Sequence, residues 1–339
     1  MPSCLMGKSV GLPETDHVRV AGPLTSACGL AGRADDAAMS TMDATHPDAA
    51  LGKENALRAA LAGLPRVLVA FSAGVDSTYL LHIAHMVLGD RCEAVTADSP
   101  SMARRSLDEA VHFCAAHGIR HHVVKTAEFE QEAYRANDGQ RCYHCKSALF
   151  AAMNALAAAT ASERGDAALL LGAIAEDFGD IRPGLQAAAE AGARWPLADA
   201  GFSKPDVRAR SKAAGLATWD RPAEPCLSSR VPYGEIVTPE AMRMIEAAEE
   251  CLHWLGLREC RARHHTIGAS GAGSKARGFL CRIEVPEADF ATVITARATL
   301  IPALRQIGYQ QVALDLAGFA SGGMNALLSD SERQRATSL

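Results

Sequence analysis

The residues with the clearest chemical potential form a short loop at positions 72–77, which reads Ser-Ala-Gly-Val-Asp-Ser. The apolar run before it predicts a buried parallel strand, and the pattern after it predicts a helix. Backbone N–H groups left unpaired at a helix N-terminus, together with the helix dipole, favour a phosphate anion. We expect Gly74 to let the backbone approach that phosphate and the hydroxyl groups of Ser72 and Ser77 to donate to it.

The carboxylate of Asp76 is a poor direct ligand for phosphate. It is better suited to a Mg²⁺ ion that bridges phosphate oxygens. Small residues with Ser and Asp also suit an ordinary strand-to-helix turn, so composition alone leaves both interpretations open.

Cysteines form a second group with chemical potential: Cys142 and Cys145 in a C-x-x-C pair, and Cys226 further along the chain. The pair places two sulfurs within reach of one metal centre, but it is half of a four-thiolate zinc site and the sequence has no second pair. A redox dithiol belongs directly after the first strand, where the 72–77 loop lies instead. Packing of the two thiols as small hydrophobic groups remains a third interpretation.

Arginines form a third group. Arg261 and Arg263 are two residues apart in a predicted strand and should project from the same face, which suits a phosphate or carboxylate ligand. Arg230 is a candidate third member. Glu284, on the next predicted strand, would orient an arginine or hold Mg²⁺. A solvated basic edge strand is the alternative.

Composition limits the class of protein. The 339 residues carry a net charge of -5, which disfavours broad binding of nucleic acid, although a local basic groove stays open. Ten scattered cysteines indicate a reducing compartment. No apolar run approaches the ~20 residues of a membrane span, and the N-terminal segment does not read as a secretory signal. We therefore expect a cytoplasmic protein with no membrane partner.

The elements that must position these residues alternate between strand and helix. Predicted strands at 66–71, 93–97, 121–125 and 168–173 indicate an α/β fold with a parallel, doubly wound sheet, in which ligands bind at the carboxyl ends of the strands. A different pattern follows residue 232, with a helix that starts after Thr238 and three predicted strands. The predicted organisation has four parts: a disordered extension at 1–48, an α/β domain at 49–232, a small α+β domain at 233–325, and a frayed tail at 326–339.

The loop resembles the Ser-Gly-Gly-x-Asp-Ser loop of the PP-loop ATP pyrophosphatases, whose fold is also called adenine nucleotide alpha-hydrolase-like. This resemblance implies that residues 49–232 form an ATP pyrophosphatase domain and that the small domain at 233–325 serves substrate binding or oligomerisation. Further motifs over roughly 52–325 are similar to those of one branch, the LarE family of sulfur transferases that build the nickel-pincer nucleotide of lactate racemase. These motifs are Gly179 to Gly184, Thr218-Trp219-Asp220, Glu224 to Gly234, Arg261 to His264, Arg282 to Pro286, and Asp315 to Phe319 with Gly322 to Asn325.

This resemblance implies that ATP adenylates a carboxylate of pyridinium-3,5-biscarboxylic acid mononucleotide and that a sulfur nucleophile then displaces AMP. In some members the cysteine equivalent to Cys226 gives up its own sulfur. Others add a C-x-x-C pair and hold a [4Fe-4S] cluster, and the present chain, with Cys142, Cys145 and Cys226, matches that three-cysteine type. The implied partners are a small nucleotide substrate, a sulfide donor and further copies of the same chain.

Three positions depart from the family pattern. Ala73 stands where Gly is usual, Ile174 where Asn is common, and Gly323 where Ser is common. The methyl group of Ala73 would crowd a pyrophosphate if the position needs a positive φ. A PP-loop tRNA thiolase and a binding module that no longer turns ATP over are the alternative functions.

Overall fold

The computed structural model describes residues 47–179, 183–268 and 278–320. All of these residues belong to one compact unit. The predicted extension, apart from Pro47 and Asp48, and the predicted tail lie outside the described residues, as does the motif around Gly323. The domain boundary near residue 233 stays a prediction.

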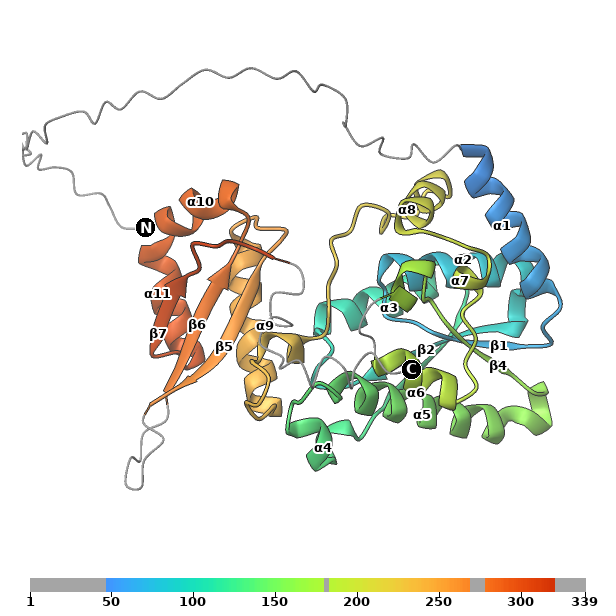
Figure 1. The fold of residues 1–339 in the computed structure, drawn as a ribbon, viewed down its shortest axis with the longest axis horizontal. Helices are drawn as coiled ribbons and strands as arrows, with labels where there is room; N and C mark the ends of the chain where they lie inside the picture. The colour runs from blue at the N-terminus through green and yellow to red at the C-terminus, as the bar shows by residue number, and fades with distance from the viewer. Residues whose placement is uncertain (1–46, 180–182, 269–277, 321–339) are drawn as a thin grey trace, which may run out of the picture. The chain divides into compact units, whose positions relative to one another are not determined.

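A parallel four-stranded sheet with its helices forms the larger part of the fold (Figure 1). Its strands are β1 (Val67–Ala70), β2 (Cys92–Asp98), β3 (Arg120–Lys125) and β4 (Ala168–Leu171), in the order β3-β2-β1-β4. All three pairings are parallel. The chain therefore winds outward from β1 to β3 and then returns to the other side of β1. The parallel sheet confirms the α/β fold class predicted from the sequence. In such sheets a ligand crevice is expected where the strand order reverses, here between β1 and β4.

Helices cover both faces of this sheet because successive side chains of β1 point to opposite sides. Val67 and Val69 pack in a core with residues of α1, α2, α3, α7 and α8. Leu68 and Ala70 pack in a second core with residues of α5 and α6. The helices are α1 (Pro47–Ala62), α2 (Val75–Leu88), α3 (Arg104–Ala116), α4 (Glu132–Arg135), α5 (Arg141–Arg164), α6 (Pro183–Glu190), α7 (Pro196–Asp199) and α8 (Lys204–Ala213).

A three-stranded sheet lies C-terminal to these elements, in the order β5-β6-β7. Strands β5 (Arg261–Ile267) and β6 (Gly278–Glu284) are antiparallel, whereas β7 (Gln311–Leu314) runs parallel to β6. Helices α9 (Pro239–Trp254), α10 (Phe290–Thr295) and α11 (Arg297–Ile307) accompany this sheet. Its core joins residues of α9 and α11 to Ala262, Cys281 and Ile283 of the strands.

The start of α9 shows why the local sequence signals worked. Thr238 is the N-cap, and its side chain accepts a hydrogen bond of 3.1 Å from the N–H of Ala241. Pro239 occupies the first turn, where its missing N–H is tolerated. Met242, Ile245 and Leu252 are buried on one face of the helix, as their spacing predicts.

No helix of the described residues is both long and apolar enough to cross a membrane.

Candidate functional site

The 72–77 loop lies at the carboxyl end of β1, and helix α2 begins at Val75, three residues earlier than the sequence pattern suggests. Asp76 and Ser77 therefore belong to the first turn of the helix. The hydroxyl oxygen of Ser77 accepts from the N–H of Ser72 at 3.3 Å and lies 3.2 Å from the carbonyl of Gly74. These contacts close the loop around the helix N-terminus, where N–H groups without partners inside the helix suit an anion such as phosphate.

Ala73 has a φ of +57°, so this position does need the left-handed conformation. Its methyl group nevertheless packs in the core and is 3% exposed, and Ala73 is not among the residues that line the adjacent cavity. The methyl group strains the backbone without narrowing the cavity. The expected crowding of a phosphate at this position does not follow from the geometry.

Asp76 is positioned for a cation. Its Oδ2 lies 2.6 Å from Nζ of Lys204. Its Oδ1 is buried and has no hydrogen-bond partner among the described residues. A buried carboxylate oxygen without a partner suits a divalent cation, so Asp76 fits the role of a Mg²⁺ ligand.

Gly172, directly after β4, is a site residue that sequence reasoning missed. A Cβ atom there would lie 2.9 Å from the backbone nitrogen of Ser77 and 3.0 Å from its Cα. No side chain fits, so glycine allows the start of α2 to approach the end of β4. A single Gly after an apolar strand was the only sequence signal.

One cavity of about 930 Å³ brings the three predicted groups together. Its lining includes Ser72, Gly74, Asp76 and Ser77 of the loop, the three cysteines, and the three arginines Arg230, Arg261 and Arg263. Glu284 is the one predicted site residue that does not line it. Residues from β1 to β5 thus meet at the carboxyl end of the parallel sheet.

The cysteines approach the cavity from two segments. Cys142 and Cys145 lie among the first five residues of α5, and Cys226 precedes the short 3₁₀ helix Leu227–Arg230. Burial raises the pKa of the Cys145 thiol to about 12, and the nearby Cys226 adds to this shift. Among the described residues, no three His, Cys, Asp or Glu side chains are arranged to hold a metal ion. An iron–sulfur cluster makes a different demand, because each thiolate binds its own iron and the sulfurs do not meet at one point. Three thiols on one cavity fit that donor set.

The first turn of α5 is held against α6 by a second glycine contact. A Cβ atom on Gly184 would lie 2.9 Å from Cγ of Lys146 and 3.4 Å from the carbonyl oxygen of Cys142. A larger residue at this position would displace the Lys146 side chain next to Cys145.

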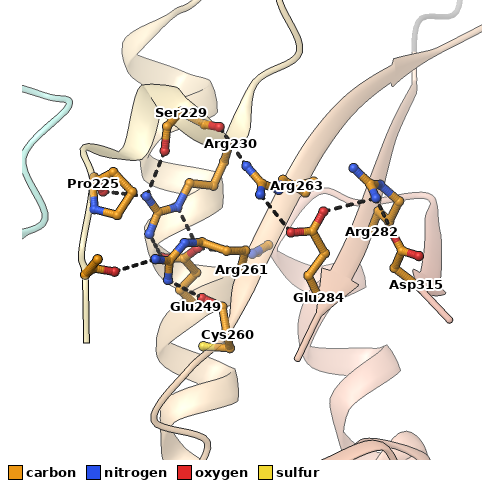
Figure 2. A network of polar contacts seen from close by, with 12 residues as sticks. Pro225, Ser229, Arg230, Glu249, Cys260, Arg261, Arg263, Arg282, Glu284 and Asp315 are labelled. Carbon is orange, nitrogen blue, oxygen red and sulfur yellow. Dashed lines mark hydrogen bonds and ion pairs between the residues drawn. The ribbon is translucent and has the colours of Figure 1, made fainter. Parts of the chain in front are cut away.

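Arg230 is buried and fully engaged by the protein (Figure 2). Its Nε and Nη2 pair with the two carboxylate oxygens of Glu249 at 2.8 and 2.9 Å. Its Nη1 donates to the carbonyl of Cys226 at 3.1 Å and also to that of Pro225. The substrate contact of Arg230 stays a prediction; in the structure its guanidinium holds the backbone carbonyls of Pro225 and Cys226.

Arg261 is the more available cation. Nη1 and Nη2 donate to the carbonyls of Cys260 and Ala223 at 2.7 and 2.6 Å, and no carboxylate of the described residues forms an ion pair with it. Burial, with Arg230 nearby, lowers the pKa of Arg261 to about 10. Its guanidinium also lies over the Phe319 ring, with 4.9 Å between Cζ and the ring centroid. A buried guanidinium without a direct ion pair at a cavity wall suits an anionic ligand.

Arg263 projects from the same side of β5. It donates from Nη1 to the carbonyl of Ser229 at 2.8 Å and pairs through Nη2 with Glu284 at 2.7 Å. Its Nε is buried without a hydrogen-bond partner among the described residues. Glu284 also pairs with Arg282 at 3.0 Å, and Arg282 in turn contacts Asp315 (Figure 2). The position of Glu284 fits the predicted role of orienting an arginine.

A second group of basic residues that line the cavity was not predicted. Lys204 and Arg208, one turn apart on α8, line the cavity together with Arg221. Nη1 of Arg208 donates to the carbonyl of Trp219 at 2.9 Å, and Nη1 of Arg221 donates to that of Ala73 at 3.0 Å. The Ser-x-x-Asp capping box at Ser203 signalled the helix start, but nothing in the sequence indicated which surface would face the loop.

In the part of the chain that the structure describes, the histidines and the other cysteines do not line the cavity. His264 is buried against Tyr309 and Phe279, and His122 pairs with Glu93. Cysteines 92, 114, 260 and 281 are buried and Cys251 is half-buried, and none of these five lines the cavity. Cys4 and Cys28 lie outside the described residues.

Ile174 does line the cavity and is 5% exposed, so the departure at this position presents an apolar surface there.

No protein-family model matches the chain. An uncharacterised protein of Synechocystis sp. is 38% identical over 275 residues, which cover 80% of this chain and 97% of that protein. The pyridinium-3,5-bisthiocarboxylic acid mononucleotide synthase of Lactiplantibacillus plantarum is 36% identical over 281 residues, which cover 83% of this chain and 96% of that protein. An uncharacterised protein of Methanocaldococcus jannaschii is 24% identical over 259 residues, 76% of this chain and 91% of that protein.

Proposed function

The chain belongs to the LarE family, that of the pyridinium-3,5-bisthiocarboxylic acid mononucleotide synthases, and we propose that it is an ATP-dependent sulfurtransferase that converts carboxylates of a pyridinium dicarboxylate mononucleotide to thiocarboxylates. One observation carries the proposal. A single cavity is lined by a phosphate loop, by three thiols and by two arginines on one strand face.

The first step activates the substrate. A carboxylate oxygen attacks the α-phosphorus of ATP, the bond between that phosphorus and the bridging oxygen of the pyrophosphate breaks, and pyrophosphate leaves. Backbone N–H groups at the start of α2 and the hydroxyl groups of Ser72 and Ser77 bind the leaving pyrophosphate. Asp76 would hold a Mg²⁺ ion, which supplies further neutralisation of phosphate charge.

The second step transfers sulfur. A sulfur nucleophile attacks the acyl carbon of the mixed anhydride, the carbon–oxygen bond to AMP breaks, and AMP leaves with that oxygen. Cys142, Cys145 and Cys226 would hold an iron–sulfur cluster, which supplies an iron position for exchangeable sulfide. Arg230 positions this step, because its hydrogen bonds to the carbonyls of Pro225 and Cys226 set the direction of the Cys226 side chain.

Substrate binding uses the β5 arginines. Arg261 and the orphaned Nε of Arg263 offer donors to the phosphate or the second carboxylate of the substrate. Glu284 keeps the Arg263 guanidinium turned toward the cavity through its 2.7 Å ion pair.

The decisive experiment measures pyrophosphate release from ATP with no acceptor, with the pyridinium dicarboxylate mononucleotide, or with bulk tRNA. We expect release only with the pyridinium compound, accompanied by a product in which sulfur has replaced oxygen in its mass spectrum. Release that depends on tRNA would assign a tRNA thiolase instead, and no release with either acceptor would leave a binding module.

Two variants separate the steps. Asp76→Asn should abolish pyrophosphate release. Cys226→Ser should retain release but form no thiocarboxylate. Loss of release in Cys226→Ser would contradict the assignment of Cys226 to the sulfur step alone.

A further inference from the structure

Lys204 occupies an unfavourable place for a cation. It is the first residue of α8, in a turn where the helix dipole favours negative charge. The capping box formed by Ser203 and Asp206 already completes this helix start without it. The position of Lys204 therefore has a reason outside its own helix.

That reason is Asp76. Nζ of Lys204 lies 2.6 Å from Oδ2 of Asp76, across 128 residues of chain. The two side chains are 38% and 24% exposed, and both line the cavity. The pair is therefore accessible to a ligand in the cavity.

The contact sets up a competition for one carboxylate. Asp76 is the residue of the loop that fits a divalent cation, and Lys204 already supplies it with a positive charge. A cation that binds Asp76 alone must overcome repulsion from Lys204. The repulsion is relieved when a phosphate oxygen offers Lys204 a second anionic partner.

The surroundings favour a move of the Lys204 ammonium group from Asp76 to a phosphate. Arg208, one turn further along α8, donates from Nη1 and Nη2 to the carbonyls of Trp219 and Arg221 at 2.9 and 2.8 Å. No carboxylate of the described residues forms an ion pair with Arg208, so its positive charge also favours a phosphate here. Glu176 and Asp177 also line this part of the cavity, and Oε1 of Glu176 accepts from the backbone N–H of Lys204 at 3.0 Å. The Lys204 backbone is thus held while its ammonium group can turn from Asp76 toward phosphate.

Building on the proposed function, we propose that Lys204 is an exchangeable counterion, which passes from Asp76 to a pyrophosphate oxygen as a divalent cation takes its place on Asp76. The exchange couples binding of the metal to binding of the nucleotide in this site.

The test uses Lys204→Met in the full chain and two separate titrations, Mn²⁺ without any nucleotide and inorganic pyrophosphate in the presence of a chelator. The variant should bind Mn²⁺ about fivefold more tightly, because the competing charge is gone. It should bind metal-free pyrophosphate about tenfold more weakly, because a charged donor is lost. Lys204→Arg, which keeps the charge, should stay close to the parent in both titrations.

The chain offers a matched control. Lys53 also pairs with an aspartate of α8, Asp206, at 2.6 Å, but neither residue lines the cavity. Lys53→Met should leave both affinities unchanged. If Lys204→Met weakens the binding of both ligands, or changes neither affinity, the proposal is wrong. Opposite shifts support it, because loss of a merely structural lysine would not strengthen the binding of one ligand and weaken that of the other.

Neither titration contains the pyridinium compound or a sulfur source. Opposite shifts in the two affinities, combined with no pyrophosphate release on addition of the pyridinium compound, would reject the proposed function and keep the exchange. Pyrophosphate release on addition of the pyridinium compound, without opposite shifts in the two affinities, would reject the exchange alone.

Discussion

Nη1 of Arg221 donates a 3.0 Å hydrogen bond to the carbonyl oxygen of Ala73, the residue of the 72–77 loop that adopts a positive φ. The two residues are 148 positions apart in the chain. Arg221 also pairs with Glu109 of α3 at 2.6 Å, so an ion pair outside the loop holds its guanidinium in place. The strained peptide is thereby held from outside the loop.

Arg221→Gln should weaken ATP binding. Loss of a hydrogen bond from a charged donor corresponds to a roughly tenfold higher KM for ATP, measured by pyrophosphate release. The matched control is Arg91→Gln, because Nη1 of Arg91 also donates to backbone carbonyls, those of Leu64 and Pro65, but before the start of β1. A KM for ATP in Arg221→Gln no higher than in this control would mean that the contact does not organise the loop.

Ala73→Gly should change the free energy of unfolding by less than ~1 kcal/mol. Relief of left-handed strain of ~1–2 kcal/mol is offset by the lost burial of a methyl group and the greater freedom of glycine in the unfolded chain. The kcat/KM for ATP should stay unchanged, since the methyl group faces the core. Ala73→Val should lose about 2 kcal/mol or more in urea titration, because a β-branched residue strongly resists this φ. A large gain of activity in Ala73→Gly would instead show that the methyl group obstructs the site.

Glu249→Gln should destabilise the protein by about 3 kcal/mol and abolish sulfur transfer while ATP still binds. The substitution leaves the Arg230 guanidinium buried without its carboxylate. The double variant Arg230→Met with Glu249→Leu should recover most of the stability, since an apolar pair can replace a buried ion pair. It should not recover thiocarboxylate formation, because the hydrogen bonds to the carbonyls of Pro225 and Cys226 are lost. Recovery of both properties would show that Arg230 does not position Cys226.

Serine substitutions at Cys142, Cys145 and Cys226 should each reduce the iron and acid-labile sulfide bound after anaerobic reconstitution to a small fraction of the parent value. Cys251→Ser, which alters a half-buried thiol away from the cavity, is the control and should bind iron normally. An active parent protein without iron, whose mass falls by one H₂S at Cys226 during turnover, would establish sulfur donation by that residue instead.

Stability should fall in acid because of Glu93. Burial alone would raise the pKa of this carboxyl group, but hydrogen bonds from Arg66, His122 and Arg164 outweigh it and lower the pKa from 4.5 to about 2. The unfolded chain therefore takes up this proton near pH 4.5, whereas the folded protein does so only near pH 2. The carboxylate stabilises the fold above pH 4.5, and this contribution, of order 3 kcal/mol, is lost between pH 4.5 and 2. Urea titrations across that range should show a smaller loss for Glu93→Gln than for the parent.

The local elements were predictable because their signals lie within a few residues. The apolar run of β1, the Thr-Pro start of α9 and the small-residue loop before α2 each specify a conformation through side chains adjacent in the chain. The observed helix boundaries differ from the predicted ones by a few residues, as at Val75, because a helix can begin inside a loop whose residues are small.

The site was partly predictable for the same reason. The sequence alone predicted a phosphate loop, three cysteine ligands and the two β5 arginines, because each motif has its own chemistry and spacing, and the structure places all of these residues on one cavity. It also placed the loop at a carboxyl strand end, because parallel strands with helical crossovers bring those ends to one edge.

Only the tertiary structure decided what each charged side chain does. Arg230 and Arg261 look equivalent in sequence, yet one is bound to Glu249 and the other has no carboxylate partner among the described residues. Lys204 and Arg221 carry no motif and reach the loop across 128 and 148 residues. The role of an ionic side chain depends on which opposite charge or carbonyl lies within about 3 Å, and only the packing of distant segments determines that.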